Sequence, residues 1–119
     1  MSLNKQEGNI GEATATKFLK EKGYKILELN YRTPRGEIDL VAQDGDIIVF
    51  VEVKTRSSMK YGVPSLAVNY QKQRHIRNSA IYYLKAKHLL DKVSARFDVV
   101  SILMNGSTDY EIEHLQNAF

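Results

Sequence analysis

The stretch GEIDLVAQDGDIIVFVEVKTR, residues 36–56, holds two apolar runs separated by a short polar segment. The segment QDGD at 43–46 is typical of a β-hairpin turn, because Asp-Gly is the strongest short hairpin signal. The first run nevertheless contains Asp39, and the second contains Glu52 and Lys54. A charge inside such an apolar strand needs a partner or a ligand, because burying it alone costs much free energy. These three residues are therefore candidates for a functional site.

The length of the turn decides which side chains of the hairpin share a face. A turn centred on Asp44-Gly45 predicts that Asp39 lies opposite Phe50. Because alternate residues of a strand share a face, Glu52 and Lys54 then point the same way as Asp39. In this register Asp39 and Glu52 are diagonal neighbours, roughly 7 Å apart or a little less. A loop one residue longer or shorter would move one set to the other face.

Two explanations of these charges are open from the residues alone. One is a ladder of ion pairs on the wet face of an antiparallel sheet. In the second run, however, the residues that point to either face are apolar, which is typical of a strand covered on both sides. Two carboxylates without a cation would repel and raise one pKa; Lys54 could compensate one charge, whereas a divalent cation would compensate both. Carboxylate ligands without cysteine or a nearby histidine suit Mg²⁺ or Mn²⁺.

Glu12 is a further candidate from the first predicted helix. It lies seven positions before Leu19, so the two residues fall within about 20° of each other around the helix. Gly8, Gly11 and Ala13 beside it are small, which lets another backbone or a ligand approach closely. The alternative is an exposed glutamate that interacts with the helix dipole near its N-terminus.

The remaining helices and strands are predicted from the spacing of apolar residues and from the Gly, Pro and polar residues that end each element. The patterns predict a helix from about Lys5 to Lys22, a strand over 24–32, the hairpin, a loop over 57–65, a helix from roughly Ala67 to His88, and strands over 95–104 and 110–115. This order, α-β-β-β-α-β-β, predicts one α/β domain over residues 1–119 with a mixed sheet. The helical crossover predicts that the third and fourth strands are parallel.

Composition excludes several classes of protein. The chain has no cysteine, which excludes disulfides and thiolate sites. No apolar run approaches the roughly 20 residues of a membrane helix, so we expect no membrane association. The polar N-terminus has no apolar core of signal-peptide type. These features lead us to expect a cytoplasmic protein.

The charge distribution points to a polyanionic partner. The formal net charge is only +3, yet residues 54–90 contain eight Lys and Arg and no acidic residue. A block of one sign is typical of nucleic-acid binding, although a solvated helix face has the same composition. The candidate phosphate-binding residues are Arg32, Arg35, Arg56, Lys60, Lys72, Arg74 and Arg77.

Together these residues resemble the PD-(D/E)xK nuclease superfamily. Asp39 matches the acidic residue of its first half-motif, and Glu52-Val53-Lys54 matches the ExK half-motif, whereas Ile38 stands where the superfamily name has proline. More narrowly, the chain resembles the YraN-like family of small bacterial proteins. The likeness covers nearly the whole chain, including GNIGEATATKFLKEKGYKIL, NYRTPRGEIDLVA, VFVEVKTR, YGVP, RFDVV and HLQNAF.

The resemblance implies a restriction-endonuclease-like three-layer fold, with a central mixed five-stranded sheet flanked by helices, similar to archaeal Holliday-junction resolvases. It implies a Mg²⁺- or Mn²⁺-dependent endonuclease in which Asp39, Glu52, the Val53 carbonyl and Glu12 hold the metal. Lys54 would position or activate the attacking water. The expected substrate is branched or otherwise structured DNA, and cutting two strands favours a homodimer. The alternative is a nucleic-acid-binding accessory protein whose nuclease activity is cryptic or lost.

Overall fold

A computed structural model describes residues 2–56, 68–105 and 109–119 of the chain. The predicted loop over 57–65, with Lys60, lies outside these residues. The elements are α1 (Ser2–Glu21), β1 (Lys25–Thr33), β2 (Gly36–Asp44), β3 (Ile47–Arg56), α2 (Tyr70–Ala86), β4 (Ser94–Asn105) and β5 (Asp109–Leu115). The order of helices and strands is the one that the sequence predicts.

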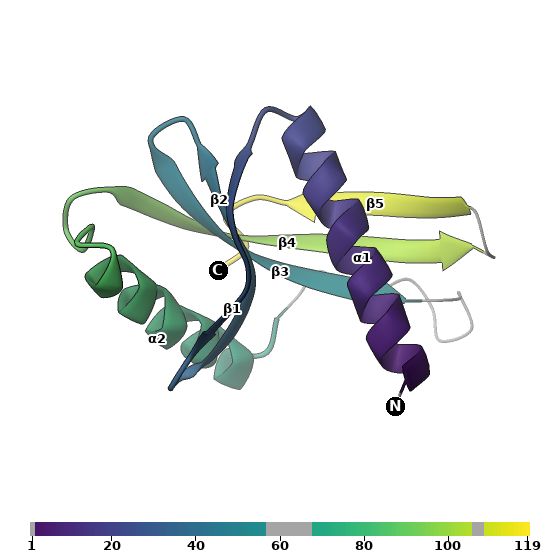
Figure 1. Ribbon diagram of the computed structural model, residues 1–119, viewed down its shortest axis with the longest axis horizontal. Coiled ribbons are helices and arrows are strands. Elements are labelled where there is room, and N and C mark those ends of the chain that lie inside the picture. The colour runs from purple at the N-terminus through teal and green to yellow at the C-terminus, as the bar shows by residue number, and fades with distance from the viewer. Residues whose placement is uncertain (1, 57–67, 106–108) are drawn as a thin grey trace.

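The five strands form one mixed sheet in the order β1-β2-β3-β4-β5 (Figure 1). All neighbouring pairs are antiparallel except β3 and β4, which are parallel as predicted, because α2 carries the chain back between them. The two helices cover opposite faces of the sheet. This confirms the three-layer α/β arrangement.

Each face of the sheet has its own apolar core. Ala15 and Leu19 of α1 pack with Leu40, Val51 and Val100, among others, on one face. On the other face, α2 contributes the buried side chains of Ala80, Tyr83 and Leu84, which pack with Ile38, Val41 and Phe50. The central strands are therefore apolar at both alternations because both of their faces are covered.

The hairpin between β2 and β3 corrects the predicted register. The turn consists of Gly45 and Asp46, so Asp44 pairs with Ile47, and Phe50 lies opposite Val41 rather than Asp39. Gly45 has φ +61°, the positive value that a type II′ turn requires at its first central position. The turn still has two residues, so moving its centre by one position leaves the faces unchanged.

Gly11 is the point of close approach between α1 and β3. A Cβ atom added at Gly11 would overlap Oγ1 of Thr55 and would lie 3.2 Å from the Cβ of Thr55. The small residue predicted to permit a close backbone approach therefore does so, and the adjacent Glu12 is held near the sheet.

Gly11→Ala is therefore expected to destabilise the protein by roughly 1–3 kcal/mol, the usual cost of overpacking. Helix propensity alone predicts the opposite sign, because alanine normally favours an exposed helix by about 1 kcal/mol over glycine. Urea denaturation of Gly11→Ala, Thr55→Ala and the double variant measures the effect. The double variant should recover much of the loss, and strictly additive changes would contradict the proposed contact.

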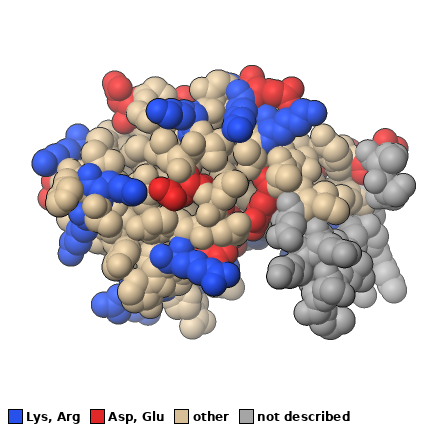
Figure 2. Space-filling view, viewed as in Figure 1, with Lys and Arg blue, Asp and Glu red and all other residues tan. Residues whose placement is uncertain are grey.

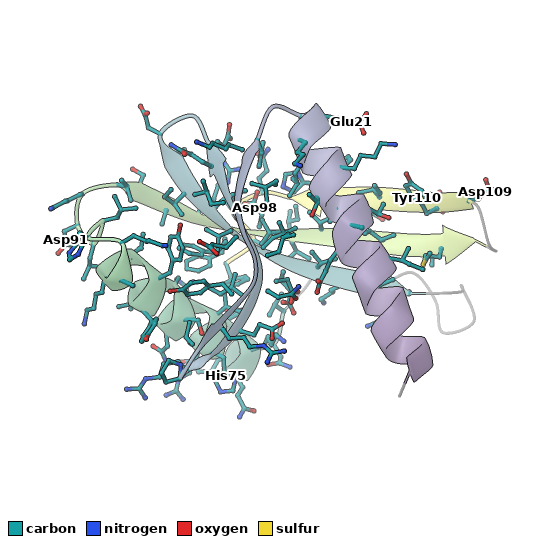
Figure 3. All side chains as sticks on the ribbon, viewed as in Figure 1. Glu21, His75, Asp91, Asp98, Asp109 and Tyr110 are labelled. Carbon is teal, nitrogen blue, oxygen red and sulfur yellow. The ribbon has the colours of Figure 1, made fainter. Side chains whose placement is uncertain are left out.

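Asp98 on β4 anchors the C-terminal segment. Its side chain is fully buried and accepts hydrogen bonds from Arg96 Nε (2.9 Å), His114 Nε2 (2.8 Å) and the backbone N–H of Asn117 (3.0 Å). Lys22 Nζ, which can only donate, lies 2.8 Å from His114 Nδ1, so Nε2 carries the imidazole hydrogen. Burial opposes ionisation of Asp98, but these hydrogen bonds outweigh it and hold its pKa below the ordinary value. Figure 3 shows Asp98 in the middle of the molecule.

Candidate active site

Asp39 lies where the pairing between β2 and β3 ends. The last pair of the ladder is Leu40 with Val51, and beyond it the backbone N–H of Val53 donates to Oδ2 of Asp39 at 2.9 Å. The alternation of β2 is also interrupted here, because Ile38 packs in the α2-side core and Leu40 in the α1-side core. The aspartate side chain thus takes the place of a backbone acceptor.

Asp39 and Glu52 form a pair of carboxyl groups in hydrogen-bond contact. Burial, the negative charge of Glu52 and this hydrogen bond raise the pKa of Asp39 to about 8, although the Val53 N–H acts in the opposite direction. The corrected register explains the contact, since extending it by one step would put Asp39 directly across from Glu52 instead of diagonal to it. The predicted convergence of the two carboxylates is found, through a different pairing.

Glu12 of α1 completes an acidic cluster with this pair. Burial raises the pKa of Glu12, a hydrogen bond with the Asn30 side chain lowers it, and the charges of Glu37 and Glu52 raise it further. Glu12 also contributes to the raised pKa of Asp39. Glu12 therefore faces the sheet rather than solvent alone.

Asn30 is a residue of this site that the sequence reasoning missed. It lies within β1 with φ +51°, a left-handed conformation that asparagine tolerates better than most residues. Such strained positions cluster at functional sites, and this one bonds Glu12. The available signal was an asparagine inside a predicted strand, where that residue type is depleted.

Two lysines approach the acidic pair from different elements. Burial and the charge of Arg56 lower the pKa of Lys54, whereas the charge of Glu52 raises it. Lys54 therefore lies within the electrostatic reach of the pair. Lys72, near the start of α2, places Nζ 3.4 Å from a carboxylate oxygen of Glu52, whose side chain is only 11% exposed. A residue expected to contact phosphate thus neutralises part of the acidic pair.

The donor set fits a hard divalent cation. Within the described ranges, no group of three or more carboxylate and imidazole side chains is arranged as it stands to hold a metal ion. Mg²⁺, however, typically takes only one or two carboxylates and keeps several waters. The contacting pair of Asp39 and Glu52 meets that requirement.

The chain matches the family model described as "Uncharacterised protein family UPF0102" over residues 11–102. The chain belongs to this UPF0102 family. A relative from Geobacter metallireducens is 52% identical over 120 residues, covering 100% of this chain and 97% of that protein. Another, from Alkaliphilus oremlandii, is 50% identical over 118 residues, covering 98% of this chain and 100% of the relative. The family match confirms the expected YraN-like identity.

The UPF0102 protein is also similar to the solved structure of Pyrococcus furiosus SfsA in complex with Ca²⁺. The TM-score is 0.45 at 14% identity, covering 95% of this chain and 63% of that chain. A likeness at this level carries no argument about function. In the described part of the UPF0102 protein, no helix is both long and apolar enough to cross a membrane.

Several of the predicted phosphate-binding residues are exposed. Figure 2 shows Asp and Glu near the middle of one face, with Lys and Arg above and below them. Arg32 of β1 forms an exposed ion pair with Glu37, its partner residue on β2, at 3.3 Å. Arg35, Arg56 and Arg74 are exposed.

Arg77 has a different environment from the other arginines. Its guanidinium lies over the rings of Phe97 and Phe119, at 5.0 and 5.4 Å from their centroids. Part of its role is therefore to hold the C-terminal residue against the sheet.

The metal-free protein should lose stability as the pH rises from about 4 to about 8. In this range folded Asp39 keeps a proton that unfolded Asp39 has released, so unfolding releases a proton and rising pH favours it. Because one pKa unit corresponds to about 1.36 kcal/mol, we expect Asp39→Asn to gain roughly 1–3 kcal/mol over the wild type between pH 5 and pH 8.

Urea denaturation in EDTA at several pH values measures this difference. Asp46→Asn, at the exposed turn of the same hairpin, is the control and should show no such gain. A difference between Asp39→Asn and wild type that stays flat from pH 5 to pH 8 would contradict the assignment. Millimolar Mg²⁺ should reduce the difference, because a cation compensates both carboxylates.

Proposed function

We propose that this UPF0102 protein is a divalent-metal-dependent endonuclease that hydrolyses DNA phosphodiesters. The observation that carries the proposal is the contact between Asp39 and Glu52 at the end of the β2–β3 ladder, beside Lys54. Burial beside Glu52 raises the pKa of Asp39, and such a carboxyl pair is costly to keep unless it serves a ligand or a reaction. Lys72 beside Glu52 and the exposed arginines Arg35, Arg56 and Arg74 suit a polyanionic substrate.

Asp39 and Glu52 would hold Mg²⁺ or Mn²⁺, with the Val53 carbonyl as a further ligand. The cation, when bound, supplies Lewis-acid stabilisation of charge on the phosphoryl oxygens. The Val53 N–H donates to Oδ2 of Asp39 and so fixes the orientation of this carboxyl group. Glu12 would complete the site directly or through a bound water, and its hydrogen bond with Asn30 restricts its orientation.

Lys54 would position the attacking water and stabilise negative charge in the pentavalent transition state. Its lowered pKa weakens the hold on its proton, which suits a group that takes part in proton transfer. Lys72, through Glu52, balances charge when the site holds no substrate. On binding DNA, Lys72 would be free to exchange Glu52 for a phosphate.

Shape rather than base sequence would select the substrate. The candidate contacts are lysines and arginines, which bind phosphates and carry no sequence information there. We therefore propose branched or otherwise structured DNA as the substrate class. A homodimer would place two such sites on the two strands of a junction.

The test is cleavage of a four-way junction by the pure protein with Mg²⁺ or Mn²⁺, compared with a linear duplex of matching sequence. We expect nicked products from the junction that disappear in EDTA, analysed on denaturing gels. Tight DNA binding without cleavage under either metal would reject the endonuclease and leave a nucleic-acid-binding accessory protein. Failure to bind DNA even at low salt would reject both.

A further inference from the structure

A groove of about 710 Å³ runs between α1 and the edge strand β1. Ala13, Lys17 and Lys20 line it from α1, and Leu29 and Asn30 line it from β1. Its volume lies within the range of roughly 300–1,000 Å³ that is usual for sites holding small ligands. Figure 1 shows α1 and β1 as neighbours on the near side of the molecule.

The groove is continuous with the acidic cluster. Glu12 and Asn30 line the groove, and the charge of Glu12 also acts on Asp39 of the carboxyl pair. Further along α1, the groove reaches Glu21 at the C-terminal end of the helix, which Figure 3 labels. A molecule lying in the groove therefore has one end at the candidate active site.

The walls of the groove combine an exposed apolar surface with four charged side chains, those of Lys17, Lys20, Glu12 and Glu21. Leu29 is 53% exposed although it is a large apolar residue in a strand. Lys17 and Lys20 are three positions apart, so they are neighbours on the helix surface. An apolar patch beside two lysines matches a base and its flanking phosphates. Inside a duplex the flat faces of the bases are stacked on one another, so away from a duplex end a base that contacts Leu29 through its face must be unpaired.

We propose that this groove binds an unpaired nucleotide of the DNA, next to the phosphate at the Asp39–Glu52 pair. The substrate is then DNA with a single-stranded segment at the cleavage position, such as a flap, tail or open branch point. This inference rests on the proposed nuclease function and specifies the substrate class of that same site.

Cysteine protection tests the proposal because the chain contains no cysteine, so one introduced thiol is unique. Leu29→Cys reports on the groove. Leu115→Cys is the matched control, because Leu115 is also an exposed leucine, 39% accessible, on the opposite edge strand β5. Each variant is labelled with a fluorescent maleimide in Ca²⁺, with a ten-nucleotide thymidine strand, a blunt duplex or no DNA.

We expect the single strand to slow labelling of Leu29→Cys about tenfold when it is at ten times its Kd. Labelling of Leu115→Cys should not change, and the blunt duplex should protect neither position. Unchanged labelling at position 29, or equal protection at both positions or by both DNAs, would overturn the proposal. If labelling of position 29 slows with rising protein concentration in the absence of DNA, the groove binds a second copy of the chain and the proposal fails.

A charge reversal gives a second readout. Lys17→Glu combined with Lys20→Glu should weaken single-strand binding by at least about tenfold in fluorescence anisotropy and leave blunt-duplex binding unchanged. The control is Lys85→Glu combined with Lys92→Glu, two exposed lysines that do not line the groove. If both pairs act alike, the groove assignment fails. If the wild type cuts junctions but DNA does not protect position 29 from labelling, only this inference fails. If the wild type binds no DNA, the proposed nuclease function fails as well.

Discussion

Asp39→Asn is expected to lower the rate of Mg²⁺-dependent DNA cleavage by at least roughly 100–1,000-fold, the usual effect of removing one group that stabilises transition-state charge. The amide keeps the size of the side chain and can still accept from the Val53 N–H, so the local backbone should hold. What it loses is the anionic oxygen that attracts the cation. Gel assays under single-turnover conditions measure the rate.

The same variant should bind Mn²⁺ more weakly in calorimetric titration, yet be more stable than wild type at pH 8 without metal. Loss of activity together with gained stability separates a catalytic defect from misfolding. Asp46→Asn, which removes the same charge at the exposed turn, should cut at the wild-type rate. Lys54→Ala should also lose cleavage but retain Mn²⁺ binding, because an ammonium is not a metal ligand. Wild-type cleavage by Asp39→Asn would rule out this site.

Asp98→Ala is expected to lower the free energy of unfolding by about 3–5 kcal/mol, the typical cost of removing one partner from a buried ion pair. Arg96, whose side chain is only 14% exposed, would lose two hydrogen bonds to Asp98, and His114 would lose its acceptor. The Asn117 N–H would also lose its bond, releasing the C-terminal segment.

Asp109→Ala is the matched control, because Asp109 is exposed on β5 and surface changes usually stay within about 0.5 kcal/mol. Urea denaturation at pH 7 gives both values. Asp98→Asn should fall between them, since the amide keeps acceptor capacity without the charge. Since the Asp98 pKa is lowered, its stabilisation should also fade as the pH drops through that pKa. A loss below about 1 kcal/mol for Asp98→Ala would mean that the cluster relaxes around the gap.

Local patterns were sufficient for most of the fold. The helix predicted from roughly Ala67 to His88 is present as α2, and its 3.6-residue period buries Ile76, Ala80, Tyr83 and Leu84 against the sheet. The helix begins at Tyr70 rather than near Ala67, since the Asn69 side chain accepts from the Lys72 N–H and caps it there. The parallel pairing of β3 and β4 also followed, because a helical crossover requires it.

The candidate site was only partly accessible to such reasoning. The Asp44-Gly45 pair predicts a hairpin. Whether Gly45 takes the first or the second central position of the turn depends on backbone dihedral angles, which the sequence does not specify. Asp39 and Glu52 lie close together in the predicted and in the actual register, because the two registers differ by an even number of residues and so leave the faces unchanged. The actual contact depends on where the β2–β3 ladder ends.

The sequence by itself determined the element order, the two-sided burial of the sheet and the residue types of the site, because these depend on local periodicity and on side-chain chemistry. Only the tertiary structure decided that Lys72 pairs with Glu52, that Asn30 bonds Glu12, and that His114 bonds Asp98. Each of these contacts joins residues far apart in the chain. They form because the sheet brings separate strands and helices within hydrogen-bond distance, which no local pattern encodes.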